Sequence, residues 1–150
     1  MLLGLIFLHC GKNSSTNPGE TISISELNTK GWNKFGLMLL DDAAVYFDDV
    51  LLRDGQNTSA NLGKGWVLLL QEDENLSLVQ NHLLKATLET ETESDAKCGL
   101  AALFLIHKNY PAVISNCTEV INSNAQYFFQ YLPSIDWHDV LVMKAEAQFY

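Results

Sequence analysis

Positive charge is scarce in this sequence. Nine lysines and arginines stand against eighteen aspartates and glutamates, which gives a formal net charge of −9 at pH 7. Recognition of nucleic acid normally needs a basic surface, so this balance argues against a nucleic-acid-binding protein. The same balance argues against electrostatic attachment to anionic lipid.

Proline, glycine and long hydrophobic runs are also sparse. Three prolines and nine glycines in 150 residues are too few for a disordered or fibrous chain. The hydrophobic content of 47% is enough to bury one ordinary core. No apolar stretch reaches the roughly 20 residues that span a bilayer. No segment alternates for long enough to predict a strand, so the expected fold class is all-α.

Residue constellations that carry catalysis or hold a metal are missing as well. Ser94 and Lys97 have the spacing of a serine–lysine enzyme motif but lack its companion motifs. Three histidines lie far apart and are expected at the surface or at helix ends: His82, His107 and His138. The aspartates between positions 41 and 54 lack the calcium-loop pattern, and no phosphate-binding glycine loop occurs. The sequence therefore predicts no enzyme, no metal and no cofactor.

The first residues, "MLLGLIFLHC", differ in composition from everything after them. They are apolar as far as Leu8, reach Cys10, and are followed by the polar stretch "GKNSSTNPGE". The apolar run has the length of a signal-peptide core. This order of segments resembles the start of a bacterial lipoprotein. The resemblance implies a signal-peptide-like segment at residues 1–9, lipid attachment at Cys10, and a flexible tether at 10–24. It also implies a protein anchored in the bacterial cell envelope, facing the periplasm or the cell exterior.

Beyond the tether, apolar residues recur at helical spacing in seven successive segments. Two of these segments contain Gly-Trp, in "TKGWNKF" and "GKGWVLL", and Gly31 and Gly65 are 34 residues apart. The same step reaches Gly99. We expect Ser94 to cap the fifth helix after an acidic loop, "LETETESD", and Asp136 to cap the seventh.

Pairs of helices with a 34-residue step resemble the tetratricopeptide repeat over about residues 25–122. The signature positions hold Leu27, Gly31, Phe35, Ala43 and Phe47, then Gly65, Trp66, Ser77 and Leu84, then Ala101, Tyr110, Ile114 and Val120. The resemblance implies an α-solenoid of antiparallel helix pairs, about seven helices in a right-handed superhelix, over residues 25–150. Its units would be about 25–57, 58–92 and 94–124, with a further unit starting at 135–150. That last unit lacks its second helix, so we expect a fragment or an end that needs a partner.

In this family the small residue lets the two helices of a unit approach closely, so we expect Gly31 and Gly65 to face the second helix of their own unit. The first helices line an inner face that binds peptides or proteins. The matching positions here are Asn28, Trp32, Phe35, Leu62, Trp66, Leu69, Ala102 and Leu105. Trp32 and Trp66 occupy equivalent positions, and they form either an aromatic strip for a partner or packing between repeats.

The sequence thus predicts a non-catalytic scaffold that binds a protein or peptide. Two alternatives stay open. One is a glycan-binding surface lipoprotein of a nutrient-uptake system, whose tryptophans stack on sugar, and the other is an accessory helical domain of a larger protein. Cys98 and Cys117 are expected on facing helices, either as buried free thiols or as a disulfide.

Overall fold

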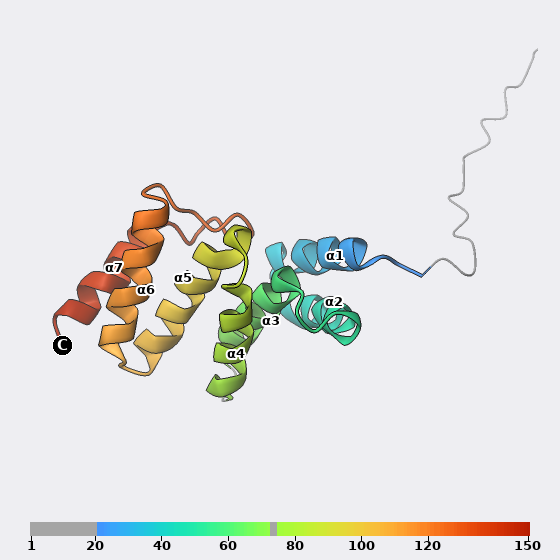
Figure 1. Ribbon diagram of the computed structural model, residues 1–150, viewed down its shortest axis with the longest axis horizontal. Helices are drawn as coiled ribbons and strands as arrows, with labels where there is room; N and C mark the ends of the chain where they lie inside the picture. Colours follow the sequence, from blue (N-terminus) through green and yellow to red (C-terminus); the bar gives the residue numbers. More distant parts are fainter. Residues whose placement is uncertain (1–20, 73–74) are drawn as a thin grey trace, which may run out of the picture.

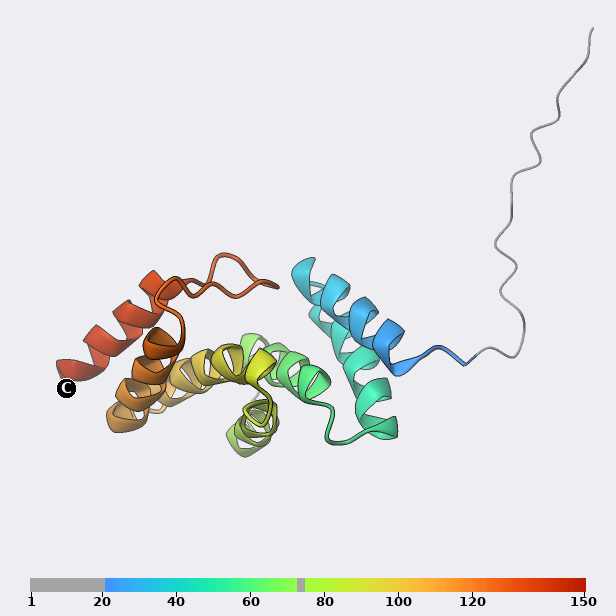
Figure 2. The same ribbon diagram turned by 45° about the horizontal axis from the view of Figure 1, so that its top comes forward.

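The computed structural model describes residues 21–72 and 75–150 of the chain. These residues form seven α-helices and no β-strand, with one isolated β-bridge between Phe128 and Asp136, so the all-α prediction is confirmed. Figures 1 and 2 show the helices following one another in chain order. Their bounds are α1 Ile24–Gly36, α2 Leu40–Arg53, α3 Thr58–Leu70, α4 Leu76–Ala86, α5 Thr90–Ile106, α6 Tyr110–Ser123 and α7 Trp137–Gln148.

Consecutive helices pack as pairs, α1 with α2, α3 with α4, and α5 with α6. The first helices of neighbouring pairs also touch, because α1 contacts α3, α3 contacts α5, and α5 contacts α7. Within the described ranges, α2, α4 and α6 make no contact with one another. The first helices are therefore more closely spaced than the second helices. We call their common side, which carries Trp32, Trp66 and Ala102, the inner face.

Glycines allow the close approach within and between these pairs. A Cβ atom on Gly31 would lie 2.7 Å from the ring of Phe47 in α2, and one on Gly65 would lie 2.7 Å from Leu83 in α4. Both glycines thus face the second helix of their own pair, which confirms the sequence prediction. Gly63 has a role that the sequence did not reveal. Its Cβ atom would lie 2.2 Å from Phe47, so it packs α3 against α2 of the preceding pair.

The repeat is also visible in the backbone. Each first helix of a pair is followed by a non-glycine residue in the left-handed region, and the three are Met38, Glu72 and Lys108. The first separation, of 34 residues, equals the sequence step, and the second, of 36 residues, is two residues longer. In the first pair the Leu39 amide closes this turn by donating to the carbonyl of Lys34 at 3.0 Å. None of the three is glycine, which is why the composition does not mark these turns.

The ends of two helices test the capping predictions. Asp136 caps α7 as predicted: its carboxylate accepts from the His138 amide at 2.7 Å, and its own amide donates to Asp139 at 2.9 Å. The prediction for the fifth helix is wrong, because α5 already begins at Thr90. Its first turn contains glutamates, which the positive end of a helix dipole stabilises, so the acidic stretch is helix rather than loop. Ser94 consequently lies inside α5.

We expect Gly63→Ala to destabilise the protein, although alanine favours a helix by about 1 kcal/mol over glycine. The new methyl group would overlap the buried ring of Phe47, and overpacking of this kind costs about 1–3 kcal/mol or more. Chemical denaturation measures the difference. Gly55→Ala is the matched control, because its Cβ atom would meet nothing closer than 3.6 Å. Equal stability of Gly63→Ala and the unmodified protein would contradict this packing.

Candidate functional site on the inner face

The segment of residues 124–136, which links α6 to α7, runs across the inner face as a narrow hairpin (Figure 2). Its two arms are joined by main-chain hydrogen bonds. The Trp137 amide donates to the carbonyl of Tyr127 at 2.8 Å, and the Phe129 amide donates to the carbonyl of Ile135 at 2.9 Å. We call residues 124–136 the inner hairpin. No feature of the sequence analysis anticipated it.

Alternate side chains of the first arm enter the inner face. Tyr127 and Phe129 are 2% and 0% exposed, whereas Phe128 between them is 60% exposed. Tyr131 is half-buried at the tip. This alternation is the geometry of an extended chain, whose successive side chains point to opposite sides. One inward ring therefore meets each helix pair, with Tyr127 beside Cys98 of α5, Phe129 on α3, and Tyr131 on α1.

The two tryptophans are joined through this hairpin. The ring centroid of Phe129 lies 4.9 Å from that of Trp66 and 6.1 Å from that of Trp32. Tyr131 stacks on Trp32 with centroids 3.8 Å apart and planes 11° apart. Trp32 and Trp66 are only 5% and 2% exposed. They lie on the inner face as expected, but the chain's own aromatic residues cover them, so truncating either would cost folding stability.

The other positions predicted to bind a partner are also partly or fully covered. Phe35 and Leu62 are buried, whereas the others are half-buried: Asn28, Leu69, Ala102 and Leu105. Five of these eight residues line two cavities on the inner face. Asn28 and Trp32 line one, and Trp66, Leu69 and Ala102 line the other. Binding of a partner at these positions stays a prediction.

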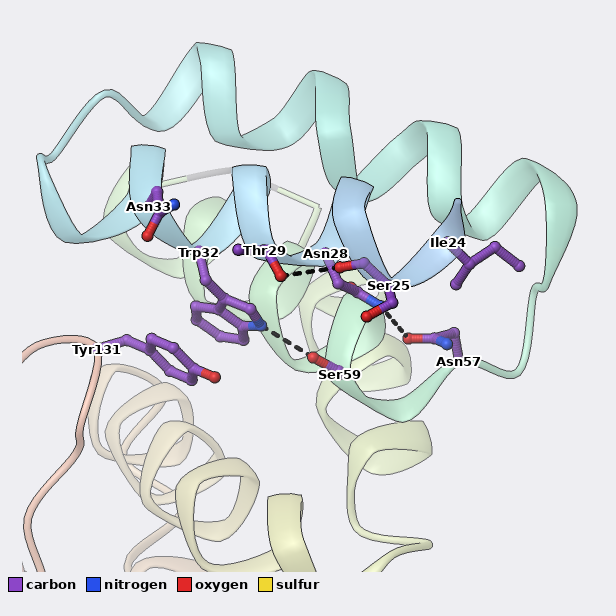
Figure 3. Close-up of a pocket in the computed structure, with 9 residues that line it drawn as sticks. All are labelled: Ile24, Ser25, Asn28, Thr29, Trp32, Asn33, Asn57, Ser59 and Tyr131. Carbon is purple, nitrogen blue, oxygen red and sulfur yellow. Dashed lines mark hydrogen bonds between the residues drawn. The ribbon is translucent and has the colours of Figure 1, made fainter. Parts of the chain in front are cut away.

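The first of these cavities is polar and has a volume of about 470 Å³. We call it the polar cavity, and Figure 3 shows its lining: Ile24, Ser25, Asn28, Thr29, Trp32, Asn33, Asn57, Ser59 and Tyr131. Three amides and four hydroxyls, one of them on Tyr131, line its wall beside the stacked rings of Trp32 and Tyr131, and none of the described side chains that line it is charged. The indole nitrogen of Trp32 donates to the Ser59 hydroxyl at 2.9 Å, which leaves the proton of that hydroxyl free to donate.

Asn28 has an unused acceptor in this cavity. The Asn57 side-chain oxygen accepts from the amide of Ala60 at 3.0 Å, which fixes it as an oxygen because a main-chain N–H can only donate. The atom of Asn28 that lies 3.1 Å from this oxygen must therefore be its NH₂ group. The remaining atom, Oδ1 of Asn28, is buried without a hydrogen-bond partner. A buried unpaired acceptor costs about 1–3 kcal/mol, so it is an unusual feature in a folded protein.

The second cavity, of about 390 Å³, lies between α3, α5 and α7 on the other side of the inner hairpin. Its wall is almost entirely apolar and includes Leu69, Ala102, Val142 and Met143. The thiol of Cys98 also lines it. Burial raises the pKa of Cys98 to about 12 and that of Cys117 to about 11, and both are free thiols. At neutral pH they are protonated and poor nucleophiles.

Asp95 is a carboxyl group at the inner face with an unusual environment. Burial beneath the inner hairpin raises its pKa to about 6, and the neighbouring hydroxyl of Tyr127 opposes part of this rise. That hydroxyl approaches Asp95 and Cys98, but the geometry falls short of a hydrogen bond, so it is a second buried polar group without a partner. The main-chain carbonyl of Asp95 accepts from the indole of Trp66 at 3.1 Å.

The remaining candidates for chemistry do not form a site. His82 is half-buried rather than at the surface, and its Nδ1 pairs with the buried side chain of Asn61 at 2.9 Å. Burial lowers the pKa of His82, so the imidazole is neutral at pH 7 and donates this bond. No group of three His, Cys, Asp or Glu side chains in the described ranges is placed to hold a metal ion. No helix in that part of the chain is long and apolar enough to cross a membrane.

Asp95→Asn should raise the stability of the protein near pH 7.5. The gain in stability should be much smaller near pH 4.5. The raised pKa means that the folded state holds the proton more tightly than the unfolded state. Stability from this group is therefore present below the unfolded pKa and is lost as the pH rises through about 6. Thermal unfolding at the two pH values checks this, with the exposed Asp49→Asn as control. A constant difference between Asp95→Asn and the unmodified protein at both pH values would be the contrary result.

Comparison with known proteins identifies no relative of this chain: no family model matches it, and neither a curated protein nor a solved structure is similar to it. The function of the inner face therefore has to be argued from its own geometry.

Proposed function

We propose that this protein is a non-catalytic interaction module that binds an extended peptide or protein segment at the polar cavity. The observation that carries the proposal is the buried, unpartnered oxygen of Asn28 in an uncharged cavity beside Trp32 and Tyr131. We further propose that the helix pairs form a tetratricopeptide-like solenoid with a right-handed superhelix. The contacts between successive first helices support a repeating arrangement of this kind.

The lining of the polar cavity suits a polypeptide main chain. An extended chain presents N–H donors and C=O acceptors in turn, and the cavity offers amide and hydroxyl groups of both kinds. A ligand N–H that reached Asn28 would pair an acceptor that is otherwise left without a partner, which adds to affinity. The edge of the stacked Trp32 and Tyr131 rings supplies apolar area with few rotatable bonds.

Asn28→Leu should weaken partner capture without lowering stability. Leucine has a similar size and removes the unpartnered oxygen, so we expect a melting temperature equal to or above that of the unmodified protein. Capture of a partner from membrane extracts should fall by about tenfold or more, equivalent to about 1.4 kcal/mol. Pull-down followed by mass spectrometry measures capture, and thermal unfolding measures stability.

Asn81→Leu provides the control, since Asn81 is an exposed residue of α4. Its capture of the partner should stay normal. Equal capture by both variants would contradict the proposed site. Saturable tryptophan fluorescence changes with oligosaccharides, lost in Asn28→Leu, would instead favour the alternative of a glycan-binding lipoprotein. If the protein is an accessory domain of a larger protein, the captured partner would be another part of the same polypeptide chain.

We propose in addition that Cys10 carries a lipid that anchors the protein in the bacterial cell envelope. Cys10 lies outside the described residues, so this proposal depends on the composition of the segments around it. Cys10→Ala should move the protein from the detergent phase to the soluble periplasmic fraction. Recovery of the unmodified protein in the soluble fraction, with its first nine residues intact, would contradict the anchor.

A further inference from the structure

The outer edge of the inner hairpin's first arm is an unpaired strand edge. The carbonyl of Tyr127 and the amide of Phe129 point to the second arm of the hairpin, where they are hydrogen-bonded. Peptide groups alternate in direction along an extended chain, so the amide and carbonyl of Phe128 point the opposite way. Phe128 makes no hydrogen bond to another main-chain group within the described ranges, and the chain turns after Phe129. An open edge of this kind is a template for a strand from another chain.

Three cavities follow one another along this edge. The first, of about 460 Å³, lies between Phe128 and the start of α5. The second, of about 270 Å³, shares Glu91, Asp95 and Gln130 with the first and reaches the start of α3. The third is the polar cavity, which shares Ser59 and Tyr131 with the second. We call the three together the edge trough. The shared lining residues place the three cavities side by side along the hairpin.

The edge trough is acidic at its α5 end. Glu91 and Asp95 line its first two cavities, and Glu89 lines the second. No lysine, arginine or histidine lines any of the three cavities. The only buried polar groups without a partner in the described ranges, on Asn28 and Tyr127, belong to residues that line its two ends. Charge complementarity therefore selects a basic chain at the α5 end and an uncharged one at the α1 end.

We propose that the edge trough binds a basic, extended peptide, which adds to the inner hairpin as a β-strand. Its main chain pairs with the outward amide and carbonyl groups of Phe128, the bridge residue of the first arm. Its lysine or arginine side chains reach Glu89 and Glu91, and its uncharged end enters the polar cavity at Asn28. Strand addition takes affinity from main-chain hydrogen bonds and specificity from alternate side chains. This inference rests on the proposed function and names the binding mode and the chemistry of the partner.

A synthetic peptide of about ten residues that alternates lysine and threonine is the probe, with the unmodified protein as the target. We expect it to bind in isothermal titration calorimetry, with an affinity that falls as salt rises. The counterpart with glutamate in place of lysine should bind about tenfold more weakly or not at all. Methylating alternate main-chain nitrogens in one register should weaken binding about tenfold, and methylating the other register should change it little. Each hydrogen bond contributes about 0.5–1.5 kcal/mol, and only one register faces the hairpin.

Matched variants then locate the peptide. Glu91→Gln should weaken binding of the lysine peptide about two- to fivefold, which is the usual range for one exposed ion pair. Glu146→Gln, an exposed residue of α7, should leave binding unchanged. Phe128→Pro removes the outward amide and should weaken binding further. If that variant fails to fold, the methylated peptides still test the edge, because they require no change in the protein.

Several results would overturn the inference. They are failure of the lysine peptide to bind, equal binding of the glutamate peptide, or equal weakening by both methylation registers. The proposed function is judged separately, by partner capture in Asn28→Leu. Asn28→Leu could lose capture while the lysine peptide fails to displace the partner from the unmodified protein. That result would leave the polar cavity as the site and exclude strand addition at the edge trough.

Discussion

The ring of Phe47, enclosed by two glycines on neighbouring first helices, sets the spacing on which the inner face depends. Cβ atoms on Gly31 and Gly63 would each lie within 3 Å of this ring, so any larger residue would force α1 and α3 away from α2. Because both helices approach the same side chain of α2, they also contact each other. Trp32 and Trp66 are thereby brought close enough for the single ring of Phe129 to touch both.

The inner hairpin uses that spacing and changes what the inner face can do. Without it, two indoles would form an open aromatic strip; with it, they become part of the core. The hairpin also divides the remaining open surface. The polar cavity and the acidic part of the edge trough lie along one side of it, and the apolar cavity between α3, α5 and α7 lies on the other. The surface that stays open to a partner therefore lies along the borders of the hairpin rather than at the tryptophans.

The buried polar groups near the inner face are of two kinds. Some are fully hydrogen-bonded within the protein, and others have no partner. Asn61 is fully buried and uses its amide group completely, bonding to the carbonyls of Gly55 and Asn57 and to His82. Such a network fixes the helices and has nothing left for a ligand. Oδ1 of Asn28 and the hydroxyl of Tyr127 are buried but unpaired, and both residues border the edge trough. The unpaired groups therefore belong to residues at the border of the surface that stays open.

Local rules in the sequence determined the seven helices and the Asp136 cap of α7, because periodicity and capping act over a few residues. The orientation of Gly31 and Gly65 was expected from the resemblance to a repeat of helix pairs. That resemblance also placed Trp32 and Trp66 on one face, but it could not show that residues 124–136 cover it. That segment has no helical period, and its inward side chains, Tyr127, Phe129 and Tyr131, have no surface to alternate against until three helix pairs have packed. The role of Gly63 was hidden for the same reason, since Phe47 reaches it only from another helix. Tertiary packing alone decided which polar groups near the inner face stay unpaired, because hydrogen-bond partners distant in sequence are set by the fold.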